Sequence, residues 1–75
     1  MKELLLYVAK QLVDHPEAVT VTEREDAGAT VLELRVAPED MGKVIGRQGR
    51  IAKAMRTVVK AAATRENKKV SVDII

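Results

Sequence analysis

Hydrophobic residues in the first half of the chain recur with a helical period and then with a strand period. Between residues 2 and 14 they follow helical spacing. That run stops before Pro16, and proline disfavours α geometry in the residue that precedes it. Residues 19–23 alternate apolar and polar side chains, and residues 31–36 do so again after a short turn at 26–28. The pattern predicts a helix followed by an antiparallel hairpin.

Two of these elements carry more specific expectations. The apolar arc of the first helix, once Leu6 is included, spans roughly 200°, whereas a core-facing stripe needs little more than about 100°. We expect the surplus either to extend the core or to contact a second protein chain. In the second strand, the side chains of Leu32, Leu34 and Val36 should face the core. Val31 and its alternate neighbours should face outward.

The second half of the chain predicts two helices and a last strand. Pro38 is well placed in the first turn of a short helix that ends at Gly46. A longer helix should run from about Gly49 to Thr64, with an apolar face and a basic face. The expected core face is Ile51, Met55, Val58, Val59 and Ala62, and the expected basic face is Arg50, Lys53, Arg56 and Lys60. Residues 70–75 alternate again and close the domain as a strand.

The predicted order is helix, strand, strand, helix, helix, strand, without an internal repeat, a low-complexity segment or a linker. The third strand follows two helices and can return parallel to the second, through a crossover that should be right-handed. The sequence therefore predicts a single α+β domain over residues 1–75. Its three-stranded mixed sheet should have the second strand in the centre and the helices packed on one face.

A glycine turn lies between the two central helices, where Gly46 and Gly49 bracket Arg47 and Gln48. Glycine has no Cβ, so it adopts positive φ and lets another chain approach its backbone closely. Unpaired N–H groups at the start of a helix attract phosphate. Gly42, inside the preceding helix, costs about 1 kcal/mol relative to Ala, so we expect close packing or a close ligand there. The turn is typical of a clamp for a nucleic-acid backbone.

The net charge of +2 is small, but its distribution is uneven. Residues 1–40 hold four basic and nine acidic side chains, whereas residues 41–65 hold seven basic side chains and no acidic one. The positive field is therefore focused on the glycine turn and the helix after it, as expected for an anionic partner. A solvated helix face is the alternative explanation.

The sequence contains no recognisable pattern of catalytic or metal-ligating side chains. It has no Cys, and its only His, His15, lies beside a proline at the helix stop without a convergent partner, which favours a surface or capping role. The glycines match neither the P-loop nor the dinucleotide-binding pattern. We expect no catalytic residue, metal, cofactor or small-molecule substrate. The N-terminal apolar run is too interrupted for a signal peptide or a membrane span, which favours a cytoplasmic protein.

The ten residues from Gly42 to Ile51, with a hydrophobic pair before the glycine turn, strongly resemble the signature of a type II KH domain. The αββααβ order also matches type II rather than type I. The resemblance extends over the whole chain, because the helix stop at residues 14–17 and the lead-in at residues 38–42 resemble the KhpA (YlqC) family. Members of this family are small bacterial proteins with one KH domain.

This resemblance implies RNA binding in the bacterial cytoplasm, self-association as a homodimer, and association with a larger KH partner, KhpB (Jag or EloR), in bacteria that have it. It also implies a role in post-transcriptional control or as an RNA chaperone, with effects on cell division, cell shape and cell-wall growth. No membrane partner is implied.

The expected mode of binding is a clamp on single-stranded RNA, in a groove beside the glycine turn. Backbone amides from Gly46 to Gly49 would hold phosphates, and an apolar floor that includes Val44 would support the bases. The absence of Phe and Trp argues against an aromatic stacking platform. A protein–protein module and a single-stranded DNA-binding protein remain alternatives. The expected RNA-binding set is Gly42, Lys43, Val44, Ile45, Gly46, Arg47, Gln48, Gly49, Arg50 and Lys53.

Overall fold

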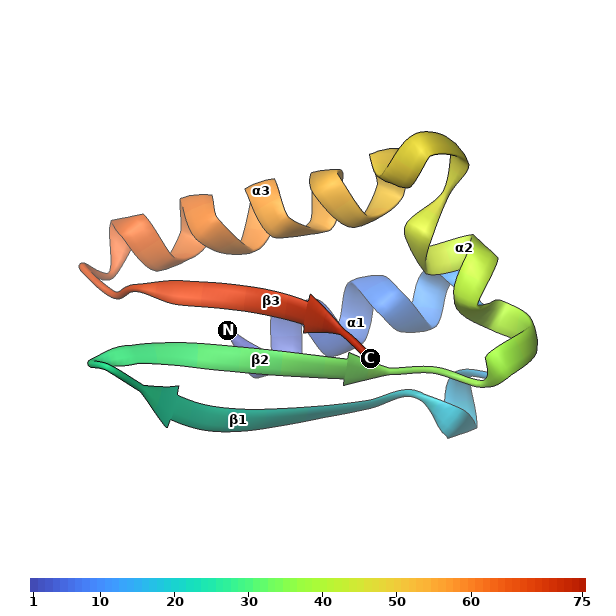
Figure 1. Ribbon diagram of the computed structural model, residues 1–75, viewed down its shortest axis with the longest axis horizontal. Helices are drawn as coiled ribbons and strands as arrows, with labels where there is room; N and C mark the ends of the chain where they lie inside the picture. The colour runs from blue at the N-terminus through green and yellow to red at the C-terminus, as the bar shows by residue number, and fades with distance from the viewer.

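The structure is a computed structural model that describes residues 1–75, and its elements follow the predicted order (Figure 1). Short 3₁₀ turns precede β1, precede α2 and join α2 to α3. No helix combines the length and the apolar character that a membrane crossing requires. The helices and strands are α1 (Lys2–Leu12), β1 (Thr20–Asp26), β2 (Ala29–Arg35), α2 (Met41–Ile45), α3 (Arg50–Arg65) and β3 (Val70–Ile74).

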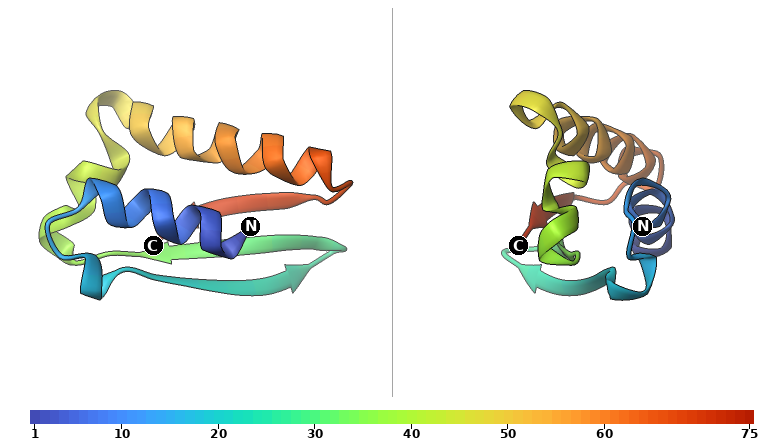
Figure 2. Two further views of the ribbon diagram at one scale, coloured as in Figure 1. Left: turned by 180° about the vertical axis from the view of Figure 1, so that it is seen from behind. Right: turned by 90° about the vertical axis from the view of Figure 1, so that its right-hand side faces the viewer.

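The three strands form one mixed sheet in the order β1-β2-β3. β1 and β2 pair antiparallel with Thr20 opposite Arg35. β2 and β3 pair parallel with Leu32 opposite Val72. The helices lie on one face of this sheet, with α1 beside α3 (Figure 2). The predicted mixed sheet with a central second strand is therefore confirmed.

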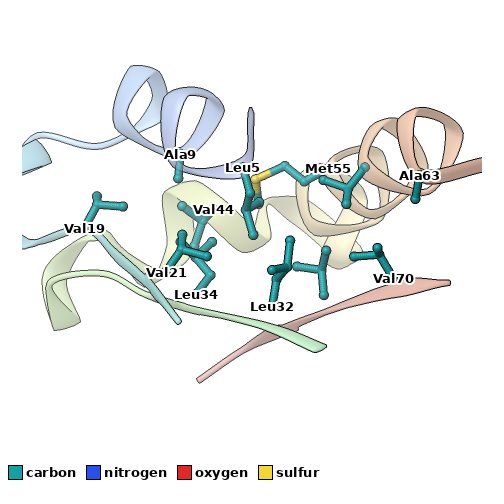
Figure 3. Packing of buried hydrophobic residues seen from close by; sticks show 12 residues of the cluster. Leu5, Ala9, Val19, Val21, Leu32, Leu34, Val44, Met55, Ala63 and Val70 are labelled. Carbon is teal, nitrogen blue, oxygen red and sulfur yellow. The ribbon is translucent and has the colours of Figure 1, made fainter. Parts of the chain in front are cut away.

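The core lies between the helices and the inner face of the sheet (Figure 3). It receives one or more side chains from every helix and strand, so no element of this small domain is dispensable for burial. α1 contributes two fully buried side chains and several half-buried ones, and part of its wide apolar arc thus extends the core. The buried cluster is Leu5, Ala9, Val19, Val21, Leu32, Leu34, Val44, Met55, Val59, Ala63, Val70 and Val72.

The buried line of α3 differs from the predicted one, and the prediction that Val58 lies in the core is wrong. Val58 is 48% exposed, and Ala62 is only half-buried. At 100° per residue the buried line is rotated by about 60° toward β3. Small side chains on that side let the helix approach the strand closely, and α3 therefore packs over β3 more than over α1. The buried residues of α3 are Ala52, Met55, Val59 and Ala63.

Val31 also departs from its predicted exposure. It faces away from the helices, yet only 7% of it is exposed. It lies in the central strand between its register partners, Arg24 on β1 and Ser71 on β3. Arg24 Nε donates to Glu33 at 3.0 Å, and this hydrogen bond lowers the pKa of Glu33. Neighbouring side chains on the open face therefore cover Val31.

Candidate nucleic-acid interface

The backbone of the glycine turn has a conformation that requires glycine at one position. Gly46 has φ 75° and ψ 176°, a region that is essentially restricted to glycine. A Cβ at this position would lie 2.6 Å from Cγ1 of Ile51. Gln48 (φ 57°) and Gly49 (φ 73°) are left-handed as well. Three of the four residues in the turn thus have positive φ, which reverses the chain within one short segment.

The amides of the turn are divided between the fold and the solvent. The Gly46 N–H donates to the Gly42 carbonyl at 2.9 Å, and the Gly49 N–H donates to the Gly46 carbonyl at 3.2 Å. The prediction that every amide from Gly46 to Gly49 is open to phosphate is therefore wrong for these two. The Arg47 and Gln48 N–H groups make none of the turn and cap hydrogen bonds, and both residues are exposed at the tip.

The segment before the turn presents backbone and one apolar side chain. Gly42 is exposed, and a Cβ added there would meet nothing within 4 Å. Of the two reasons expected for this glycine, close packing inside the chain is therefore excluded. Val44 is 0% exposed and belongs to the core, so the prediction that it supports bases is wrong. Ile45 is 37% exposed and remains available.

Lys43 is engaged by two carboxylates rather than free. Its Nζ binds Asp14 in the loop after α1 and lies 3.8 Å from Asp40. The hydrogen bond between Lys43 and Asp14 raises the pKa of the lysine and lowers the pKa of the carboxyl. The contribution of Lys43 to the field at the turn is therefore smaller than the sequence predicts.

Asp40 is a structural residue whose role the sequence analysis missed. It is only 1% exposed, and its carboxylate accepts hydrogen bonds from the N–H groups of Asp14 (3.3 Å) and His15 (2.9 Å). It thereby ties the segment after α1 to the start of α2, the helix that leads into the glycine turn. The His15 side chain lies at the surface, 3.6 Å from Glu17. In the sequence, Asp40 resembles any acidic residue in the first turn of a helix, so nothing there predicts its burial.

The basic side chains near the turn point to two sides of α3. Arg47, Arg50 and Lys53 form no ion pair and are exposed. Arg50 lines an apolar groove on the side of α1. Arg56 faces the other way, and its Nε donates to the Val72 carbonyl of β3 at 3.1 Å.

The carbonyl that Arg56 contacts belongs to the free edge of the sheet. The Thr30 N–H donates to the Lys69 carbonyl. In a parallel ladder only alternate residues direct their backbone groups to the neighbouring strand. The groups of Val72, opposite Leu32 in register, therefore point away from β2. Arg56 covers part of an edge that would otherwise be open. The sequence predicts a single basic face on this helix and does not distinguish Arg56 from the other cations.

Comparison with known proteins agrees with this geometry. The family model described as the KH domain of KhpA and KhpB matches residues 2–74. RNA-binding protein KhpA of Clostridium perfringens is 67% identical over 75 residues, covering all of both chains. The protein of the same name from Clostridium acetobutylicum is 64% identical, again over all of both chains. The Listeria monocytogenes relative is 51% identical and covers 100% of this chain and 99% of its own.

Solved structures of a larger protein contain the same fold. Era from Aquifex aeolicus, bound to GDP and AlF₄⁻, aligns with a TM-score of 0.61 at 19% identity, over 97% of this chain and 28% of Era. Era in complex with MgGDPNP and nucleotides 1506–1542 of 16S ribosomal RNA aligns with a TM-score of 0.58 at 18% identity. At these identities the likeness establishes the fold alone. The family model matches nearly the whole sequence, and full-length relatives share more than half of its residues, so the chain belongs to the KhpA/KhpB family of KH domains.

Proposed function

We propose that this protein binds single-stranded RNA through the glycine turn. The observation that carries the proposal is the conformation of Gly46 to Gly49, which leaves the Arg47 and Gln48 amides at an exposed tip. No acidic residue lies between positions 41 and 65 to compete for these donors. Relatives over the full length are named RNA-binding proteins. Membership of this family also makes the chain a binding protein rather than an enzyme.

In this mode of binding the phosphates lie at the turn and the bases lie against the helix before it. The two free amides and the Arg47 guanidinium donate to phosphate oxygens, because charge-assisted hydrogen bonds are the stronger ones. The open surface at Gly42 lets the strand approach α2, and Ile45 supplies an apolar contact. Lys53 extends the positive field along α3. One such clamp holds about four nucleotides.

The test is a double substitution in the turn, Arg47→Asp with Gln48→Asp, measured by fluorescence anisotropy with labelled decauridine. Aspartate tolerates the left-handed conformation of Gln48, so the turn survives while phosphate is repelled. We expect at least a tenfold loss of affinity, about 1.4 kcal/mol. Unchanged affinity in a folded double variant would overturn the proposal.

The matched control is Lys2→Glu in α1 with Ala27→Asp in the β1–β2 turn, which changes the net charge by the same amount at exposed positions; the β1–β2 turn lies at the other end of the sheet from α2 (Figure 1). We expect this variant to bind like the wild type, because screening limits the reach of distant charges. Competition with an unlabelled decamer of deoxyuridine, which differs from decauridine only in lacking the 2′-hydroxyl groups, identifies the sugar preference. Equal competition by DNA would widen the ligand class to any single-stranded nucleic acid.

We also propose that the protein forms a homodimer through the face made by α1 and α3, and that a KhpB partner binds the same face in bacteria that have one. An apolar groove of about 290 Å³ lies there, and Val58 projects beside it with 48% of its surface exposed. A dimer would present two clamps to one RNA and raise the effective affinity. The groove is lined by Val8, Leu12, Arg50, Ile51, Ala54, Met55 and Val58. Sedimentation velocity of RNA-free protein tests this, and a monomer at high concentration would contradict it.

The wider biology remains part of this proposal. We infer that residues 1–75 act as one KH unit in the cytoplasm, as a post-transcriptional regulator or RNA chaperone with effects on cell division, cell shape and cell-wall growth. The support is the family resemblance. Crosslinking the protein to RNA in its own cells, followed by sequencing of the bound RNA, tests this inference. Recovery of no more RNA than from the turn variant would contradict it.

A further inference from the structure

A second group of cations lies at the far end of α3, away from the glycine turn. Lys60 from α3 and Lys68 and Lys69 from the following connection line one pocket of about 240 Å³. Thr64 adds a hydroxyl, Ala63 and Val70 complete the walls, and no acidic residue lines the pocket. Three positive side chains around one concave surface repel one another in the absence of an anion.

The end of α3 is built so that these lysines keep their places. Asn67 has φ 57°, and the Lys68 N–H folds back to the Ala63 carbonyl at 2.9 Å. The Glu66 N–H donates to the same carbonyl at 3.0 Å. This capped end turns the chain sharply into β3 and holds the backbone of the two lysines beside the last turns of the helix.

Only one carboxylate, Glu66, lies within ion-pair distance of the cluster, although Lys68 and Lys69 also line a neighbouring hollow with Glu23 and Glu25. Lys60 and Lys69 form no ion pair, and Lys68 has a single exposed partner, Glu66, at 3.6 Å. An exposed pair of this kind contributes little, since solvent screens it. The ammonium groups of Lys60 and Lys69 are therefore available to an anionic partner.

Further cations connect this cluster to the glycine turn along the flank of α3 that faces β3. Lys53 and Lys60 lie on that flank with Arg56 between them, at helical spacing. Arg56 is fixed by its hydrogen bond to Val72, and its terminal nitrogens remain free to donate. From the start of α3 to Lys60 the path is about 15 Å, at 1.5 Å per residue. One extended strand can follow it from the turn to the cluster.

We propose that Lys60, Lys68 and Lys69 form a second phosphate-binding site for the same RNA strand. The RNA leaves the glycine turn, passes Lys53 and Arg56 beside the free edge of β3, and is held again at the end of α3. The footprint is then longer than the four or so nucleotides that the turn holds. This inference rests on the proposed function of the turn.

The experiment compares tetrauridine with decauridine by NMR titration of labelled protein and by anisotropy. Tetrauridine should shift the amides of Arg47 and Gln48, and decauridine should shift those of Lys68 and Lys69 in addition. The test variant is Lys60→Gln with Lys68→Gln and Lys69→Gln. The control removes three cations elsewhere: Lys2→Gln with Lys10→Gln and Arg35→Gln, all at exposed positions.

Decauridine can bind the turn at more positions along its length than tetrauridine can. Part of its higher affinity should therefore persist in every variant. The second site is measured by the affinity for decauridine that the test variant loses and the control keeps. We expect this loss to be about tenfold. The logarithmic salt slope for decauridine should also fall by about 2, at roughly 0.7 for each contact with a single strand. Tetrauridine affinity should not change. Native mass spectrometry should give the same number of protein chains on decauridine for the wild type, the test variant and the control.

The outcomes separate this inference from the proposed function. If the wild type binds tetrauridine at the turn, but the test variant matches the control for decauridine in affinity and salt slope, the second site is wrong and the clamp stands. Loss of a protein chain from decauridine in the test variant alone would also overturn it, because the three lysines would then act through the dimer rather than as a phosphate site. If neither oligonucleotide shifts the turn amides, the proposed function itself fails.

Discussion

The two flanks of α3 differ in chemistry although the same 16 residues form both. The flank toward α1 carries Ile51, Ala54 and Val58, and the flank toward β3 carries Lys53, Arg56 and Lys60. A narrow buried line between them holds the helix to the core. An amphipathic helix usually has one buried and one solvated side. Here the buried line is narrow, so both flanks remain exposed. The apolar flank suits a protein contact and the cationic flank suits an RNA contact.

This division predicts that the proposed homodimer and the proposed RNA binding can be disrupted separately. A substitution on the apolar flank should change the oligomeric state without changing the cations, and a substitution on the basic flank should do the reverse. The sharpest tests use neighbouring residues that the helix turns to different sides.

The largest effect should come from charge placed on the line that separates the flanks. Val59 is 2% exposed, and Val58 beside it is 48% exposed. Val59→Asp buries an unpaired carboxylate and should cost more than about 4 kcal/mol, enough to unfold a domain of this size. Circular dichroism during thermal denaturation measures this.

Val58→Asp is the matched variant and should keep the fold while shifting sedimentation toward the monomer. Its RNA affinity for tetrauridine should match that of the wild type, because the basic flank is untouched. Equal destabilisation by the two substitutions would mean that the buried line runs through Val58 as the sequence predicts, and the distinction between the flanks would fail.

The next largest effect should distinguish Gly46, in the glycine turn, from Gly42, in α2. Gly46→Ala brings a Cβ against Ile51 in a backbone region closed to alanine, and should destabilise the fold by about 2–4 kcal/mol. Gly42→Ala meets open space and should stabilise α2 by about 1 kcal/mol, yet weaken RNA binding. Urea denaturation and anisotropy measure the two effects. Unchanged RNA affinity in Gly42→Ala would mean that no ligand approaches there.

These residues show how far sequence reasoning reaches. Glycine spacing, the alternation of the strands and the helix stop at Pro16 are local signals, and they predict the element order and the turn. The side on which α3 packs is not local, because it depends on how closely Ala52 and Ala63 let the helix approach β3. A helical wheel ranks Val58 as more hydrophobic than these alanines and places it in the core. The predicted core face is therefore rotated away from the buried line that the structure shows.

The candidate site divides in the same way. The cationic turn is visible in the sequence because glycine and arginine are adjacent. The burial of Val44 is not visible, since Val44 and Ile45 are equally apolar and only the fold decides which one faces the core. The contacts of Asp40 and Arg56 join residues far apart in the chain, and no spacing rule connects them.

A smaller effect should come from Arg56, which serves both the fold and the basic flank. Arg56→Ala removes the hydrogen bond to Val72 and should cost about 1 kcal/mol of stability. It should also lower the logarithmic salt slope for decauridine by about 0.7. Lys53→Ala is the control, because Lys53 has no partner in the chain and should change the salt slope without a loss in thermal stability. Equal stability of the two variants would show that the Arg56 contact is absent in solution.

The smallest effect should come from Asp14 and Lys43, which are exposed and tie α2 to the loop after α1. The pKa of Asp14 lies below its ordinary 3.8, so its contribution is present above that pH and is lost as pH falls through the lowered value. The pKa of Lys43 lies above 10.5, so the same contribution is lost as pH rises through the raised value.

The difference in melting temperature between the wild type and Asp14→Asn should therefore be constant between about pH 5 and pH 9 and vanish in strong acid and strong alkali. The same substitution frees Lys43 toward the turn, so RNA affinity should rise while stability falls. Glu23→Gln changes the charge equally at an exposed residue without an ion-pair partner, and should do neither when RNA affinity is measured with tetrauridine, which does not reach the hollow that Glu23 shares with Lys68. A difference that persists in strong acid would assign the effect of Asp14→Asn to packing rather than to charge. A fall in RNA affinity would mean that Asp14 holds Lys43 in place for the ligand instead of competing with it.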